Sequence, residues 1–365
     1  MDEGITMYWL PAILIVTYFF LLLKIYRGLL KIKIFNVSAD PATFISVVVA
    51  CHNEQNNLPT LLNSISCQNY PIDLFEVIIV DDNSTDRTLE IATEFNGLRN
   101  LVTMNNLGKG KKQAIRFGIT ASKGTLIITT DADCKMGSNW IRTIAAFYEF
   151  NKPEMIICPV KIESTPGFFG RLQELEFISL QGITAGSVLM KEATMCNGAN
   201  LAFTREAYLE HSQNLHDQIN SGDDIFLLHS LKKDKSSRII WMESPEAIVT
   251  TKSSPTFISF IKQRSRWISK ARAYKDRDSI GLGIATFVAV LIQLLILIGL
   301  FIYPDLIRAF ILIMILKSIP DFLILMNTSA RHGKKKLMWW FLPTQLIYPF
   351  YVLFVILYSL TSRNR

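Results

Sequence analysis

The chain has 365 residues, a formal net charge of +7 and a mean hydropathy of +0.27. Half of the residues are hydrophobic and 19% are charged, which excludes a disordered chain. Five cysteines in this length exclude a disulfide-dense scaffold. Three short basic windows carry more than the whole net charge, and each of them flanks an apolar segment. This pattern indicates a membrane protein and predicts no nucleic-acid partner.

Four apolar segments are long enough to cross a bilayer: residues 7–23, 281–303, 306–326 and 338–360. No basic region precedes the first segment and no small-residue cleavage site follows it, so residues 1–30 are expected to form a retained anchor. The basic windows place residues 44–256 on the cytoplasmic side. We therefore expect a multi-pass protein of the inner (plasma) membrane with a cytoplasmic domain.

The third apolar segment carries Arg308, Lys317 and Asp321. Charged side chains inside a membrane segment are costly unless they are paired or reach the interface. Our preferred interpretation places Arg308 and Asp321 near the interfaces, with Lys317 extending its long side chain towards one of them. The alternative is that these charges are functional or interact between helices.

Residues 44–256 alternate between expected strands and helices. The strands are expected at 44–51, 75–80, 101–104 and 125–130, and the helices at 56–68, 84–95 and 110–122. Ser84 or Thr85 is the expected N-cap of the second helix. This alternation predicts a Rossmann-like α/β domain with a mostly parallel sheet, in which ligands bind at the carboxyl ends of strands. The chain has neither a dinucleotide glycine fingerprint nor a P-loop, which argues against a dehydrogenase or a P-loop NTPase.

Acidic residues follow two of the expected strands. Asp82 comes after the second strand, and Asp131 and Asp133 come after the fourth. In an extended chain, residues i and i+2 point to the same side, so these two carboxylates would repel each other without a cation between them. Oxygen ligands of this kind suit Mg²⁺ or Mn²⁺. The alternative is an acidic loop that caps the next helix.

A second acidic pair, Asp223 and Asp224, precedes an apolar helical stretch. A carboxylate in this position could act as a general base towards a hydroxyl group. Equally, both acids could simply stabilise the first turn of the helix through its dipole.

Two basic segments could contact phosphate groups. Lys109, Lys111 and Lys112 lie beside glycines, although they could also form a solvated loop. Residues 257–278 mix aromatic and basic side chains, which predicts an interfacial amphipathic helix. The segment QRSRW (263–267) in this helix could anchor it to the membrane, or bind a diphosphate and stack on a sugar.

Together these motifs resemble the membrane-bound family 2 glycosyltransferases, which include cellulose, chitin and hyaluronan synthases and ceramide glucosyltransferase. The resemblance is carried by VACHNE (49–54), VDDNSTD (80–86), DAD (131–133), CNGAN (196–200), GDD (222–224) and QRSRW (263–267). It covers residues 44–267, together with the arrangement of one span before the domain and several after it. It implies a GT-A fold and inverting transfer of a sugar from a nucleotide sugar.

The resemblance also assigns roles to individual residues. Asp224 would be the catalytic base, and Asp133 would hold Mn²⁺ or Mg²⁺. The resemblance places the other residues at the substrates: Glu54 and Asp82 at the nucleoside, Asp131 at the nucleotide, Asn200 on the acceptor side, and Gln263, Arg266 and Trp267 at the diphosphate and the acceptor mouth. From the residues themselves, we add Lys109 and Lys112 as phosphate contacts and Asp223 as a substrate-binding residue.

Two features favour single transfer over polymer synthesis. The base motif reads Gly222-Asp223-Asp224 where processive synthases usually have Thr-Glu-Asp, and three C-terminal spans are few for a polymer channel. We therefore expect a membrane lipid or lipid-linked saccharide as the acceptor, and a UDP-sugar rather than a GDP-sugar as the donor. The alternatives are a processive polysaccharide synthase, an inactive nucleotide-sugar-binding scaffold, an aspartyl phosphatase with Asp131 as nucleophile, and a metal-dependent nucleotidyltransferase.

Overall fold

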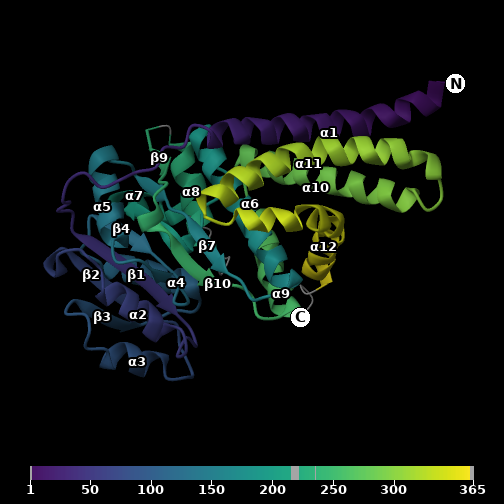
Figure 1. The fold of residues 1–365 in the computed structure, drawn as a ribbon. Helices are drawn as coiled ribbons and strands as arrows, with labels where there is room; N and C mark the ends of the chain where they lie inside the picture. Colours follow the sequence, from purple (N-terminus) through teal and green to yellow (C-terminus); the bar gives the residue numbers. More distant parts are fainter. Residues whose placement is uncertain (1, 215–221, 235, 362–365) are drawn as a thin grey trace. The chain divides into compact units, whose positions relative to one another are not determined.

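The computed structural model describes residues 2–214, 222–234 and 236–361, which divide into two compact units. The sheet unit comprises the described residues of Ile32–Glu163 and Met195–Lys252. The helical unit comprises those of Met1–Lys31, Ser164–Thr194 and Ser253–Arg365. Figure 1 shows the chain as a ribbon, coloured along the sequence from the N-terminus to the C-terminus.

A seven-stranded sheet forms the centre of the sheet unit, in the order β3-β2-β1-β4-β8-β6-β9. Its strands are β1 (Ile45–Cys51), β2 (Phe75–Asp81), β3 (Leu101–Asn105), β4 (Leu126–Thr129), β6 (Met155–Ile157), β8 (Leu201–Thr204) and β9 (Ile239–Trp241). Strands β1 to β4 are parallel, whereas β8 runs antiparallel to β4 and β6. The expectation of an α/β domain with a mostly parallel sheet is therefore confirmed. Strands β2 and β4 are buried throughout, which explains their continuous apolar sequences.

The sheet unit has six α-helices and a small second sheet. The helices are α2 (Leu58–Ser66), α3 (Thr88–Glu94), α4 (Lys111–Ala121), α5 (Trp140–Asn151), α7 (Arg205–His211) and α8 (Asp223–Lys233). The second sheet contains β5 (Lys135–Met136), β10 (Val249–Lys252) and β7 (Val160–Glu163), in that order. Short 3-10 helices lie at Ile72–Leu74, Gly198–Asn200, Ser212–Asn214 and Pro245–Ala247.

The expected N-cap of α3 was wrong. The helix begins at Thr88, and Asp86 Oδ1 accepts the Thr88 N–H at 3.0 Å. Ser84 Oγ accepts a hydrogen bond from the Asn53 N–H at 2.9 Å, so this hydroxyl ties two loops together instead of starting a helix.

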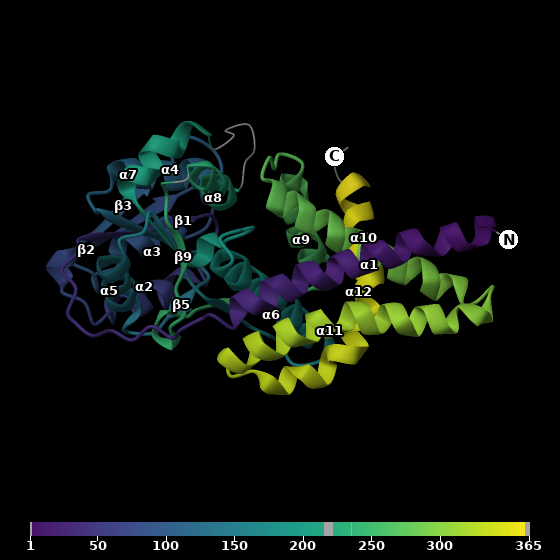
Figure 2. The same cartoon turned by 90° about the horizontal axis from the view of Figure 1, so that it is seen from above.

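The helical unit contains six α-helices and two 3-10 helices. They are α1 (Asp2–Leu29), α6 (Phe168–Leu189), α9 (Phe257–Ala271), α10 (Arg277–Gly299), η5 (Pro304–Leu306), α11 (Ile307–Arg331), η6 (Lys335–Trp340) and α12 (Phe341–Thr361). Helix α1 packs along α6, α10 and α11, and α9 packs on α12 (Figures 1 and 2). The insertion of α6 between two stretches of the sheet unit was not among the expectations from sequence.

Four stretches of the described chain are long and apolar enough to cross a membrane: Pro11–Leu29, Arg277–Gly299, Pro304–Arg331 and Lys335–Thr361. By length and composition, this confirms the expected one N-terminal and three C-terminal transmembrane helices. Helix α9 is not among these stretches, which agrees with its expected amphipathic character.

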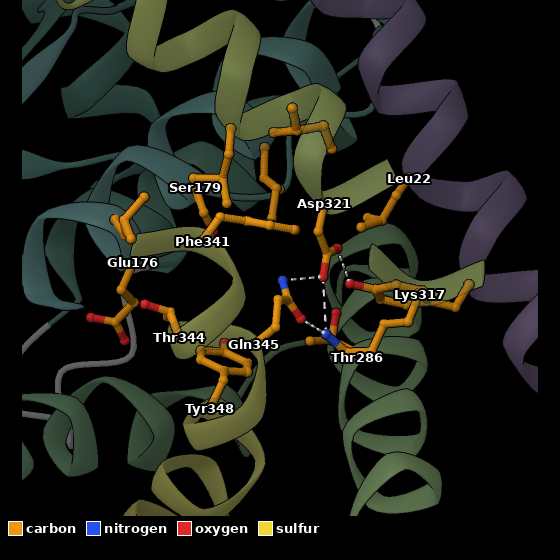
Figure 3. A pocket seen from close by; sticks show the side chains of 15 residues that line it. Leu22, Glu176, Ser179, Thr286, Lys317, Asp321, Phe341, Thr344, Gln345 and Tyr348 are labelled. Atoms are coloured by element: carbon orange, nitrogen blue, oxygen red, sulfur yellow. Dashed lines mark hydrogen bonds and ion pairs between the residues drawn. The ribbon is translucent and has the colours of Figure 1, made fainter. Parts of the chain in front are cut away.

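The interpretation of Lys317 as reaching towards an interface was wrong. Its side chain is 2% exposed, and its Nζ donates to Asp321 Oδ2 and to Gln345 Oε1, both at 2.9 Å. Tyr18 Oη donates to Asp321 Oδ1 at 2.6 Å. Figure 3 shows Lys317, Asp321 and Gln345 pointing towards one another beside a small, mostly apolar cavity of about 80 Å³. Pairing within the helix bundle satisfies this charge where it lies, so the side chain need not extend to water.

Helices α1 and α6 approach each other at backbone distance. A Cβ atom on Gly186 would lie 2.4 Å from the Ile25 carbonyl oxygen, and one on Gly28 would lie 2.2 Å from the Gly186 carbonyl oxygen. Such close crossings between membrane helices depend on residues without side chains. Glycine at these two positions therefore allows α6 to pack closely against the N-terminal helix α1.

We expect Gly186→Val to lower the stability of the helical unit by about 1–3 kcal/mol, because the added side chain must displace backbone atoms. Thermal unfolding of the detergent-solubilised chain measures this change. Gly281→Val is the matched control, because a Cβ there meets nothing within 4 Å. Equal unfolding midpoints for the two variants would contradict the packing described here.

Candidate active site

The loops that follow β1 and β2 are joined at the carboxyl edge of the sheet. The Asp82 N–H donates to the Cys51 carbonyl at 2.7 Å, and His52 Nδ1 lies 2.8 Å from the Asp82 carbonyl. Glu54 lies in the first of these loops, where its N–H donates to Thr88 Oγ1 at 2.7 Å. The parallel arrangement of β1 and β2 therefore brings two of the predicted residues to one edge of the sheet.

Asp82 organises the loop that leads into α4. Its Oδ1 accepts hydrogen bonds from Asn106 Nδ2 at 2.7 Å and from the Gly110 N–H at 2.9 Å. Lys109 lies in this loop and is exposed, whereas Lys112 is buried with its Nζ 5.7 Å from the centre of the Phe226 ring. Of the two predicted phosphate-binding lysines, Lys109 is thus the one open to solvent.

The two carboxylates after β4 lie on a turn, and the expectation that they extend from the strand was wrong. Strand β4 ends at Thr129, and the Cys134 N–H donates to the Asp131 carbonyl at 3.1 Å. Because the backbone turns here, the two side chains find different partners. Asp131 forms an ion pair with Lys111, and Asp133 Oδ2 accepts from Thr251 Oγ1 at 2.9 Å.

Burial and mutual repulsion shape the electrostatics of this edge. Burial raises the pKa of Asp133, and the negative charge of Asp131 raises it further. Burial also raises the pKa of Glu54, with contributions from Asp133 and Asp131, although a hydrogen bond from Asn57 opposes this. The three carboxylates are therefore close enough to repel one another.

Lys111 is the cation that balances part of this charge. Desolvation lowers its pKa, but the carboxylates of Asp131, Asp223 and Asp224 raise it by more, so the net shift is upward. The electrostatic field of Lys111 thus connects the acids after β4 with the acidic pair at the start of α8. The sequence singled out Lys111 only as a possible phosphate contact.

The carboxylates after β4 suit a divalent cation as a partial ligand set. The described residues include no group of three His, Cys, Asp or Glu side chains placed to hold a metal ion. Mg²⁺ and similar ions are usually held by one or two carboxylates together with water and substrate phosphates. Asp133, whose charge is only partly balanced, fits that kind of site.

Asp224 lies in the first turn of α8, beside Asp223. Its Oδ2 accepts the Gly198 N–H at 3.1 Å, which ties the start of α8 to the loop containing the CNGAN segment. Gly222 precedes the pair with a φ of 96°, a conformation that favours glycine. This glycine lets the chain turn sharply into the helix, with both acids in its first turn.

Asn200 has a structural position in this arrangement. Its side chain is fully buried, accepts from Trp140 Nε1 at 3.0 Å and donates to the carbonyls of Pro159 and Ala247, both at 2.8 Å. These three bonds join four segments of the sheet unit. Because the Asn200 side chain is buried and makes these three bonds within the protein, the geometry does not support its predicted role on the acceptor side.

The residues of the QRSRW segment belong to the helical unit, whereas the other predicted site residues belong to the sheet unit. On α9, Arg266 is exposed, and the Trp267 ring lies 4.2 Å from the guanidinium carbon of Arg264. Gln263 Oε1 accepts from Ser254 Oγ at 3.3 Å.

Sequence reasoning missed Arg264 and Thr251. Arg264 is buried and pairs with Glu176 of α6, with Nη2 and Oε2 2.5 Å apart. Arg264 is one of seven basic residues in the segment 257–278, and nothing in the sequence indicated that this one points inward. The hydroxyl of Thr251 donates to Asp133, and Thr251 lies in the short strand β10. Nothing in the sequence of that strand distinguishes this threonine from an ordinary exposed one.

We expect Asp133→Asn to stabilise the ligand-free protein at neutral pH. Because the folded-state pKa of Asp133 is raised above its unfolded value, ionisation costs stability above the folded-state pKa, and the cost vanishes below the unfolded value of about 3.9. Asparagine keeps an acceptor for Thr251 Oγ1. The thermal midpoint should rise by roughly 2–4 °C at pH 7, with a smaller gain as the pH approaches 4.

Asp73→Asn is the control for this experiment, because Asp73 is an exposed carboxylate outside the site. A lower midpoint for Asp133→Asn at pH 7, or a gain that does not depend on pH, would contradict the proposed repulsion.

Comparison with known proteins finds similar sequences and a similar fold. Residues 46–211 match the family model for Glycosyl transferase family 2. Poly-beta-1,6-N-acetyl-D-glucosamine synthase of Staphylococcus epidermidis is 25% identical over 287 residues, which cover 75% of this chain and 64% of that protein. Undecaprenyl-phosphate 4-deoxy-4-formamido-L-arabinose transferase of Edwardsiella ictaluri is 38% identical over 94 residues, 25% of this chain and 29% of that protein. The first curated relatives are matched over a fifth to a third of their own length.

Among solved structures, the mannosyltransferase PcManGT of Pyrobaculum calidifontis, in complex with GDP-Man and Mn²⁺, is similar with a TM-score of 0.59 and 19% identity. The alignment covers 96% of this chain and 97% of that one, and it supports the GT-A fold expected from sequence. The chain therefore carries a glycosyl transferase family 2 domain at residues 46–211, and it has a GT-A fold.

Proposed function

We propose that the chain transfers a sugar, with inversion, from a nucleotide sugar to a membrane lipid or lipid-linked saccharide. The observation that carries this proposal is the convergence of Glu54, Asp131 and Asp133 at one edge of the sheet, where Lys111 links them electrostatically to Asp224. In this proposal, the acidic group attracts a cation and the Asp224 carboxylate takes the proton. The four candidate spans fit an acceptor that lies in a membrane.

In the proposed mechanism, Asp224 accepts the proton of an acceptor hydroxyl. The resulting oxygen attacks the anomeric carbon from the face opposite the leaving group, and the bond to the nucleoside diphosphate breaks. The Gly198 N–H holds Asp224 in place through Oδ2. Asp223 would help to position the acceptor beside it.

Donor binding is assigned to the loops after β1, β2 and β4. Glu54 and Asp82 would line the nucleoside, Asp131 would contact the nucleotide, and Lys109 and Lys111 would approach its phosphates. Asp133 would hold Mn²⁺ or Mg²⁺, which supplies charge neutralisation for the departing diphosphate. We retain UDP as the preferred nucleotide, with GDP as the alternative because the solved neighbour carries GDP-Man.

The residues of α9 complete the proposal. Gln263, Arg266 and Trp267 would contact the diphosphate and frame the acceptor mouth, while the helix lies along the cytoplasmic surface of the inner membrane. In this proposal, residues 1–30 anchor the chain, the sheet unit forms the cytoplasmic catalytic domain, and α9 (Phe257–Ala271) forms the interfacial helix. The candidate spans Arg277–Gly299, Pro304–Arg331 and Lys335–Thr361 complete the membrane part.

One comparison favours a second candidate, a processive polysaccharide synthase. The similarity to poly-beta-1,6-N-acetyl-D-glucosamine synthase extends over 75% of this chain, beyond the family 2 domain itself. Product length separates the two candidates. A single added sugar supports transfer to a lipid, and a ladder of products supports polymer synthesis.

We expect Asp224→Asn to reduce sugar transfer by about 10²–10⁴-fold, because asparagine can accept the Gly198 hydrogen bond but cannot take a proton. Nucleotide affinity should stay within about threefold of wild type. The assay supplies a labelled nucleotide sugar and a membrane lipid extract, and follows both the lipid product and the released nucleoside diphosphate.

Asp234→Asn, at the far end of the same helix, is the matched control and should transfer sugar normally. Near-normal turnover by Asp224→Asn would remove Asp224 from the role of base. Nucleotide binding without any turnover in wild type would favour the scaffold alternative.

A further inference from the structure

A basic pocket lies where the chain leaves one candidate span and enters the next. Helix α11 ends at Arg331, and η6, which opens the last candidate span, begins at Lys335. The pocket between them encloses about 590 Å³ and is lined by Arg171 of α6 and by Lys334, Lys335 and Lys336. No acidic residue is among its lining residues in the described chain.

Two of these cations are held in place by a buried carboxylate. Glu174 of α6 is 2% exposed, with its Oε1 2.7 Å from Lys334 Nζ and its Oε2 3.0 Å from Arg171 Nη1. Ser164 Oγ also donates to Oε2 at 2.8 Å. One carboxylate therefore positions two cations at the pocket wall without balancing the full positive charge of the four.

The remaining two cations are free to bind a ligand. Lys335 and Lys336 are exposed, and within the described part of the chain neither makes a side-chain hydrogen bond or ion pair. An excess of unpaired positive charge in a concave site favours an anion with several acceptor oxygens.

The rim of the pocket has the character of a membrane interface. Trp340 lines it and packs against Phe168 with ring centres 5.6 Å apart, and the buried Leu337 also lines it. The neighbouring Trp339 is 86% exposed. Exposed tryptophans beside lysines, at the end of an apolar helix, are typical of the headgroup region of a bilayer.

We propose that this pocket binds the phosphate headgroup of an anionic phospholipid, with Lys335 and Lys336 contacting the phosphate and Trp340 lying beside the first part of the acyl chains. Basic pockets between membrane helices recognise such headgroups. Because α6, α11 and η6 all contribute side chains, the bound lipid would join the inserted helix to the membrane helices. The test of this lipid site does not depend on the sugar-transfer reaction.

The first test is lipid retention. The full chain is purified in detergent with equal phosphatidylglycerol and phosphatidylcholine, and bound lipid is measured by native mass spectrometry. We expect wild type to retain phosphatidylglycerol selectively, and the double variant Lys335→Gln, Lys336→Gln to retain at least tenfold less. Lys31→Gln, Lys33→Gln removes the same charge from another basic flank and should stay within twofold of wild type. Equal retention of the two lipids by wild type, or equal loss in both double variants, would overturn the proposal.

The second test uses wild type alone, so it stands even if a variant folds poorly. Dioctanoyl phosphatidylglycerol should raise the thermal midpoint of the protein, whereas the same concentration of dioctanoyl phosphatidylcholine or inorganic phosphate should not. A rise with inorganic phosphate equal to that with phosphatidylglycerol would overturn the lipid assignment and indicate a site for free phosphate.

Discussion

Repulsion among half-buried carboxylates is the constraint on which the candidate site depends. The parallel strands β1 and β4 bring the loops that carry Glu54, Asp131 and Asp133 to one edge of the sheet, where burial and mutual charge raise the pKa of Glu54 and Asp133. Lys111 balances part of this charge through Asp131. Uncompensated negative charge at this edge lowers the stability of the folded protein. Binding a cation together with an anionic ligand would offset this loss of stability.

The sheet could be predicted from sequence because its signals are local. Continuous apolar runs such as FEVIIV predicted buried strands, and the structure has β2 at Phe75–Asp81. The four expected membrane helices rest on the same kind of evidence, since length and hydropathy suffice to find them. Positions that depend on contacts between distant segments were harder to predict from sequence. The turn after β4, the pairing of Lys317 with Asp321 and Gln345, and the burial of Asn200 each depend on partners that only the folded chain supplies.

The insertion of α6 illustrates the same limit. Its sequence gave no sign that it leaves the α/β domain. In the structure, Gly186 packs on α1, and Glu176 and Glu174 pair with cations from α9 and from the segment after α11. Glu176 pairs with Arg264, and Glu174 pairs with Arg171 and Lys334. A chain segment that leaves the sheet and returns therefore carries much of the polar bonding of the helical unit. The QRSRW motif lies on a helix held in this way, so α6 supports residues assigned to the reaction without taking part in it.

The most direct test of the central claim is nucleotide binding, which needs no knowledge of the acceptor. The thermal midpoint of the purified chain is measured with UDP, GDP and CDP, each with and without Mn²⁺. The account predicts a Mn²⁺-dependent rise with one nucleotide, lost in Asp133→Ala, and a ligand at about 100 times its Kd should add roughly 2.7 kcal/mol. No rise with any nucleotide, in a protein shown to be folded, would contradict the assignment of this edge of the sheet as a nucleotide-sugar site.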